Sequence, residues 1–151
     1  MAEILVIEDD DNKREQLCLF IRREFPQCVI QEARSLHSGI LAVRHRAPAL
    51  VLLDMTLPNY DPSPDDAGGQ THSFGGREFL KRLERYEIRL PVIVVTQFTT
   101  IGTGPQATSL DDLDRQLEVS FPGVYVGSVY YHAAIHSWKE KLLALARSFV
   151  Q

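Results

Sequence analysis

A buried strand that ends in a single carboxylate is the feature that most constrains the fold. Five consecutive apolar residues, 49–53, precede Asp54, and Pro58 prevents a regular continuation shortly afterwards. An uninterrupted apolar run rich in branched side chains is typical of a strand buried on both faces of a parallel sheet. A charge inside such a strand is costly, so we expect Asp54 at its C-terminal end. Ligands bind at this edge of open α/β sheets, which makes Asp54 the candidate reactive group.

The rest of the chain alternates between strand-like and helix-like segments. We expect strands at 4–7, 29–33, 49–53 and 91–96 and a fifth that begins at 124, each followed by a helix. Five such alternations call for right-handed crossovers and a parallel sheet with helices on both faces. We therefore predict an α/β fold, a three-layer doubly wound (βα)5 arrangement with a five-stranded parallel sheet.

Capping residues predict where three of the helices begin. Asp11 or Asn12, Ser35 and Ser109 can each accept a hydrogen bond from the free N–H groups of a first helical turn. The segment 59–76 combines aspartate, proline and glycine with almost nothing to bury, so we expect a long inserted loop there.

Length and composition restrict the class of protein. The 151 residues suit one domain, 1–151, and the hydrophobic fraction of 44% is that of an ordinary globular chain. The formal net charge of −4 and the lack of a Lys/Arg-rich block argue against nucleic acid as a partner. No apolar stretch approaches the ~18 residues of a membrane span, so we expect no membrane and a cytoplasmic location. Cys18 and Cys28 are then expected to be reduced.

Polar residues gather where the predicted strands end. Glu8 and Asp9 follow the first strand, Asp54 the third, and Thr96 closes the fourth. Carboxylates at one edge repel each other unless a cation joins them, and oxygen ligands without His or Cys favour Mg²⁺. A carboxylate beside Mg²⁺ can attack a phosphoryl group, because the cation offsets charge on the phosphoryl oxygens. Thr96 would donate a hydrogen bond to one of those oxygens.

Three motifs together resemble the receiver domain of two-component response regulators. They are ILVIEDD at 4–10, LVLLDMTLP at 50–58 and PVIVVT at 91–96. The resemblance runs through nearly the whole chain and weakens after the third motif. It implies a flavodoxin-like, CheY-like fold and a stand-alone receiver, since the chain ends with its last predicted helix.

The resemblance also implies a role for each residue of the acidic site. Asp54 would be the phosphoacceptor, Thr96 the switch hydroxyl and Tyr125 the switch aromatic that turns inward on activation. The implied magnesium ligands are Glu8, Asp9, Asp54 and the backbone carbonyl of Thr56. A histidine kinase or phosphotransfer protein would supply the phosphoryl group in a phosphorelay, and an unknown downstream protein would receive the signal by direct contact.

The resemblance implies no catalysis beyond Mg²⁺-dependent self-phosphorylation and self-dephosphorylation. The sequence leaves open whether the chain forms a homodimer.

Three departures from the family pattern affect how phosphorylation would be transmitted. The family places a lysine at the end of the fifth strand, but residues 126–132 contain none, and Ser128 is the best-aligned position. That lysine would pair with the phosphoryl group through a charge-assisted hydrogen bond of about 1.5–3 kcal/mol. Gln97 follows the fourth strand at a position where the family has a very small residue, so its side chain would narrow access to the acyl phosphate. The long segments 59–76 and 98–109 would act as a lid or form a partner surface.

The sequence leaves two alternative functions open. Without the lysine, the chain would be a degenerate receiver that acts as a phosphorylation-independent interaction module. A haloacid-dehalogenase-type phosphatase also places an aspartate nucleophile after a buried strand, but it needs a second aspartate two residues later. This chain has Thr56 there, which disfavours the phosphatase.

Overall fold

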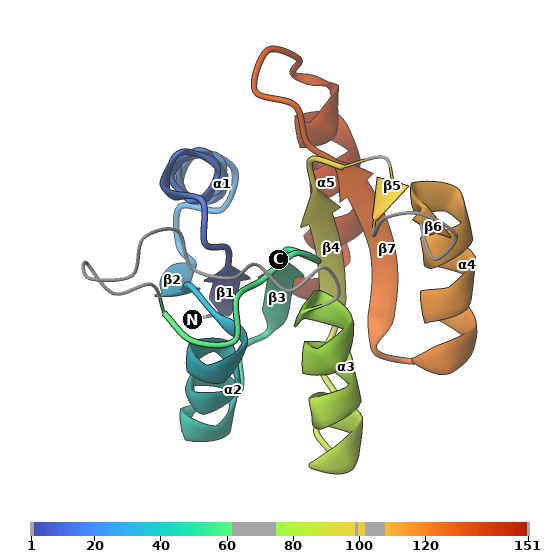
Figure 1. Cartoon of the computed structure of the whole chain (residues 1–151). Coiled ribbons are helices and arrows are strands. Elements are labelled where there is room, and N and C mark those ends of the chain that lie inside the picture. Colours follow the sequence, from blue (N-terminus) through green and yellow to red (C-terminus); the bar gives the residue numbers. More distant parts are fainter. Residues whose placement is uncertain (1, 62–74, 99, 102–107, 151) are drawn as a thin grey trace.

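The computed structural model of the chain describes residues 2–61, 75–98, 100–101 and 108–150. Strands and helices alternate along the main body (Figure 1). The main sheet contains β1 (Glu3–Ile7), β2 (Val29–Ala33), β3 (Leu50–Leu53), β4 (Val92–Thr96) and β7 (Tyr125–Tyr130). The helices are α1 (Asp11–Glu24), α2 (Leu36–His45), α3 (Gly75–Arg85), α4 (Leu110–Ser120) and α5 (Ser137–Val150). A small antiparallel pair, β5 (Thr100–Ile101) and β6 (Thr108–Ser109), was not predicted from the sequence.

The main sheet is parallel throughout, with the strand order β2-β1-β3-β4-β7. One hydrophobic cluster lies between the sheet and α1 and α5, and a second lies between the opposite face and α2, α3 and α4. The two groups of helices are visible on either side of the sheet in Figure 1. The predicted three-layer doubly wound α/β fold is therefore confirmed.

Burial explains why the central strands are uninterrupted apolar runs. Every residue of β1, β3 and β4 is buried, because helices cover both faces of the sheet at these positions. The edge strand β2 has only one buried residue, Ala33, and carries Gln31 and Glu32. None of the described helices is long and apolar enough to cross a membrane.

The predicted helix starts are confirmed for α2 and α4 and wrong for α1. Ser35 and Ser109 cap α2 and α4 as expected, each accepting a hydrogen bond from a backbone N–H of the first turn. The cap of α1 is Asp10 rather than Asp11 or Asn12, and its carboxylate accepts from the Lys13 N–H at 2.8 Å. The chain turns into the helix directly after the acidic pair, because Asp10 has the extended backbone that a cap requires.

Helix α3 begins earlier than the sequence indicated. Gly75 and Gly76 already belong to the helix, although we expected the loop to continue through 76; the segment 62–74 lies outside the described residues. A Cβ atom at Gly76 would lie 2.7 Å from the Asp54 carbonyl oxygen and 2.8 Å from Met55 Cα. Glycine therefore lets the start of α3 press against the chain that follows β3.

Candidate functional site

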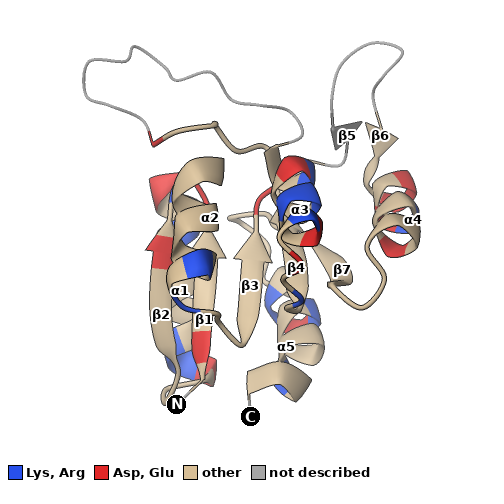
Figure 2. Cartoon of the chain, turned by 90° about the horizontal axis from the view of Figure 1, so that it is seen from below, with Lys and Arg blue, Asp and Glu red and all other residues tan. Residues whose placement is uncertain are grey.

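The ends of β1 and β3 bring the acidic residues together. The Glu8 N–H donates to the Ala33 carbonyl and the Asp54 N–H to the Ile7 carbonyl, both at 3.0 Å, so the sheet ladder continues one residue past each strand. Glu8 and Asp54 are buried, with 2% and 4% of their surfaces exposed. Figure 2 shows acidic segments beyond the strand ends at this edge of the sheet. The predicted position of Asp54 at a strand end is confirmed.

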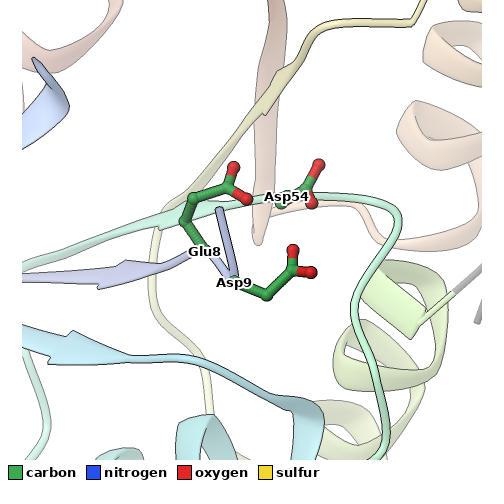
Figure 3. A group of neighbouring side chains, drawn as sticks. All are labelled: Glu8, Asp9 and Asp54. Atoms are coloured by element: carbon green, nitrogen blue, oxygen red, sulfur yellow. The ribbon is translucent and has the colours of Figure 1, made fainter. Parts of the chain in front are cut away.

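Three carboxylates converge at this edge. Oxygen atoms of Glu8, Asp9 and Asp54 all lie within 4.8 Å of one another, and Figure 3 shows these carboxylates grouped at the strand ends. Burial raises the pKa of Glu8 to about 8, although the nearby Lys13 partly opposes this effect. Burial and the Asp54 charge also raise the pKa of Asp9. Burial and mutual repulsion thus disfavour the ionised form of these carboxylates unless a cation lies beside them.

A lysine that sequence reasoning missed lies inside this group. Lys13 is 1% exposed, and its Nζ lies 2.5 Å from Glu8 Oε1 and 3.4 Å from Asp54 Oδ1. It also donates to the Val95 carbonyl at 2.7 Å. Burial alone would lower the pKa of Lys13, but attraction by Asp54 and Glu8 outweighs burial and raises it. A buried ammonium is stable only with such partners, so Lys13 and the two carboxylates depend on each other.

A sequence signal for Lys13 existed. Lys13 lies four, seven and eight residues before Leu17, Phe20 and Ile21, which form the buried face of α1. A lysine on the apolar stripe of a helix, in the turn that follows an acidic strand end, indicates a charge that points into the site.

Thr56 and Thr96 also lie at this edge of the sheet. Thr56 Oγ1 donates to Asp54 Oδ2 at 3.2 Å. Thr96 closes β4 and is fully buried, and its Oγ1 accepts from the Phe98 N–H at 3.2 Å. An open pocket of about 420 Å³ lies over the acidic group and is lined by Glu8, Asp9, Asp10, Asp11, Asn12, Asp54, Thr56, Gln97 and Phe98. Gln97 is therefore one of the residues that line this pocket, and its predicted effect on access stays a prediction.

Tyr125 is not brought near Thr96. It pairs with Val92 at the start of β4, whereas Thr96, at the far end of that strand, pairs with Tyr130. The Tyr125 hydroxyl donates to Asp114 and contacts the Ser128 hydroxyl, and burial together with the Asp114 hydrogen bond raises the pKa of Tyr125.

Ser128 does not lie at the end of the sheet either. It pairs with Val94 in the middle of β4, so it does not occupy the strand end where the family lysine was expected. The pairing of β7 with β4 is irregular, because it skips from Tyr125 opposite Val92 to Gly127 opposite Ile93. An alignment with the family that allows for no such irregularity assigns the wrong β4 partners to residues of β7.

The donor set fits a hard divalent cation. Glu8 Oε1 is buried and, beyond its ion pair with Lys13, has no hydrogen-bond partner of regular geometry among the described residues. Carboxylate oxygens with no thiol or imidazole among them are the ligands that Mg²⁺ prefers. The arrangement can therefore hold a metal ion beside Asp54, and the Lys13 ammonium contacts the same carboxylate.

Known proteins with similar sequences include response regulators. The profile of the response regulator receiver domain family matches residues 4–114. The uncharacterized protein y4jR of Sinorhizobium fredii is 38% identical over 89% of this chain and 90% of its own length. The Detocs response regulatory protein DtcB of Enterobacter cloacae is 27% identical over 93% of this chain and 95% of its own length.

Solved structures share the fold. A CheY-like response regulator receiver domain protein of Methanospirillum hungatei has a TM-score of 0.63 and 17% identity, covering 98% of this chain and 92% of that one. The signal receiver domain of a putative Luxo repressor protein from Vibrio parahaemolyticus has a TM-score of 0.66 and 16% identity, covering 99% and 89%. The family match ends at residue 114, before β7, the strand in which the expected lysine is missing.

Proposed function

The chain belongs to the response regulator receiver domain family, and from this membership we propose that it accepts a phosphoryl group on Asp54 in a two-component phosphorelay. The observation that carries the proposal is the convergence of Glu8, Asp9 and Asp54 within 4.8 Å at the edge where β1 and β3 end. The name of one relative, Detocs response regulatory protein, supports a regulatory role.

We assign Mg²⁺ to the acidic group. Glu8, Asp9, Asp54 and the backbone carbonyl of Thr56 would hold it, the last by resemblance to the family. When bound, Mg²⁺ offsets negative charge on the incoming phosphoryl oxygens. The convergence of three carboxylates, with no thiol or imidazole among them, supports this assignment.

Asp54 is the nucleophile in this scheme. One carboxylate oxygen attacks phosphorus, the bond from phosphorus to a histidine nitrogen of the kinase or phosphotransfer protein breaks, and that nitrogen keeps the electron pair. The hydrogen bond from Thr56 orients the Asp54 carboxylate. The Thr96 hydroxyl uses its oxygen to accept from Phe98, so its proton is available for a phosphoryl oxygen.

Phosphorylation then acts as a switch. It replaces the single negative charge of the Asp54 carboxylate with about −1.5 to −2 charges on the phosphoryl group, and it biases the surface around Thr96 between two states. The chain spans 90% and 95% of the lengths of two relatives, which supports a stand-alone receiver that signals by protein–protein contact. A cytoplasmic location is part of the proposal.

Acetyl phosphate provides the test. We expect the protein, incubated with Mg²⁺ and acetyl phosphate, to gain the mass of one phosphoryl group in intact mass spectrometry. Asp54→Ala should gain none, while Asp111→Ala, a change to an exposed carboxylate at the start of α4, should gain it normally. If the native protein forms no adduct and binds no Mg²⁺, the phosphoacceptor function is wrong and the chain is a phosphorylation-independent interaction module.

A further inference from the structure

A phosphoryl group on Asp54 needs a cation besides the metal, and β7 provides none. The strand runs from Tyr125 to Tyr130 and contains no lysine or arginine. The chain leaves the sheet through Tyr131, whose N–H donates to the Thr96 carbonyl at 2.8 Å. Tyr131 is 3% exposed and its ring centroid lies 5.9 Å from Lys13 Nζ. The end of this strand thus holds an aromatic ring, and the ammonium beside that ring comes from α1.

We propose that Lys13 pairs with the phosphoryl group on Asp54, so that the first turn of α1 supplies the cation that other receivers take from their fifth strand. The inference rests on the proposed phosphoacceptor function of Asp54. It assigns a role to a residue that belongs to none of the three family motifs.

The contacts of Lys13 suit this role. Its ammonium forms an ion pair with Glu8 at 2.5 Å and donates to Asp54 at 3.4 Å and to the Val95 carbonyl at 2.7 Å. The contact with Asp54 is the longest of the three. Once Asp54 carries a phosphoryl group, its carboxylate charge is replaced by the larger charge of the phosphoryl oxygens, and the ammonium is already within reach of them.

Arg14, the residue that follows Lys13 in α1, already has other partners in the structure. Its guanidinium donates to the Glu8 carbonyl at 3.0 Å, to Asp11 at 2.6 Å and to Glu32 at 3.1 Å. The segments outside the described residues contain no lysine or arginine. Among all lysines and arginines, Lys13 alone forms an ion pair with Asp54 in the part of the chain that the structure describes.

The position of Lys13 also determines which elements respond. Its backbone N–H is bound by the Asp10 cap, and its ammonium is bound by Val95, the residue before Thr96. A shift of the ammonium toward the phosphoryl oxygens therefore pulls on the start of α1 and releases the end of β4. We expect the conformational response in these two segments rather than in β7 and α5.

Beryllofluoride, a non-covalent mimic of the phosphoryl group on aspartate, tests the pairing by fluorine NMR in the presence of Mg²⁺. Lys13→Gln keeps hydrogen-bond donors but removes the charge, so we expect about ten- to a hundredfold weaker beryllofluoride binding. Lys81→Gln, a matched change at an exposed lysine of α3, should bind as the native protein does. A folded Lys13→Gln protein that binds with native affinity would overturn the inference.

The native protein gives an independent answer if Lys13→Gln does not fold. The chain has only four lysines, so the side-chain ammonium signal of Lys13 can be assigned by nitrogen NMR. We expect this signal to shift on addition of beryllofluoride, and hydrogen exchange to change at residues 10–14 and 95–96. An unshifted Lys13 signal, or exchange changes confined to β7 and α5, overturns the inference while adduct formation on Asp54 still stands. If the native protein forms no adduct with acetyl phosphate, both proposals fail together.

Discussion

The positions of two side chains, Lys13 and Tyr125, changed the interpretation of this site. Lys13 adds a buried positive charge next to Asp54, and Tyr125 lies at the opposite end of β4 from Thr96. The hydroxyl of Tyr125 donates to Asp114 and contacts Ser128 in a small polar network between α4 and β7. These contacts give Tyr125 a stabilising role in the fold, which can be measured separately from a role in switching.

We predict that Tyr125→Phe lowers stability without lowering phosphorylation. Loss of the hydroxyl removes a hydrogen bond to a carboxylate, which contributes about 1.5–3 kcal/mol. Urea denaturation should show this decrease in the free energy of unfolding, while Tyr60→Phe, at an exposed tyrosine, should show little change. Unchanged stability together with a lower yield of the acetyl phosphate adduct would instead favour the switch role predicted from the sequence.

At the scale of elements, the site is a product of where strands stop and helices start. β1 and β3 are neighbours, and the carboxylates lie directly after their C-terminal ends. Helix α1 begins shortly after β1, and Lys13 lies on its buried face. Helix α3 then packs its first turn on the backbone that follows Asp54, and only glycine allows this approach. The position of Asp54 consequently depends on α3 as well as on its own strand.

Gly76→Ala should therefore disturb both the fold and the site. Its Cβ would lie 2.7 Å from the Asp54 carbonyl oxygen, and we expect overpacking to cost about 1–3 kcal/mol. Chemical denaturation and the yield of adduct with acetyl phosphate should both decrease. Gly127→Ala is the control, because its nearest atom is the flexible tip of Leu145 at 3.2 Å. Native stability and native adduct yield in Gly76→Ala would show that the approach of α3 is not required.

At the scale of the whole molecule, the acidic group connects segments that are distant in sequence. Glu8 and Asp9 follow β1, Asp54 follows β3, and a cation between them would join the two central strands. A ligand that binds only the folded state stabilises the entire molecule by mass action. The acidic group is thus a point where metal binding and folding are coupled.

We accordingly predict that Mg²⁺ raises the melting temperature. At a concentration a hundredfold above its dissociation constant, the stabilisation is about 2.7 kcal/mol. Asp9→Asn should lose most of this effect, because it removes one of the three charges, whereas Asp111→Asn on α4 should keep it. Scanning calorimetry with Mg²⁺ and with NaCl of equal ionic strength makes the comparison. An equal rise in Asp9→Asn and the native protein would contradict a metal site at this position.

The sequence by itself determined the fold class, the order of the strands and helices around the main sheet, and the acidic strand ends. These features are local, because an apolar run followed by a carboxylate indicates a strand end whatever the rest of the chain does. Only the tertiary structure decided the partners of Asp54 beyond that acidic group. Lys13 meets Asp54 across 41 positions and Val95 across 82, and burial of its charge is favourable only once these partners are in place. The register of β7 likewise depends on its pairing with β4, and this pairing places Tyr125 and Ser128 away from the site.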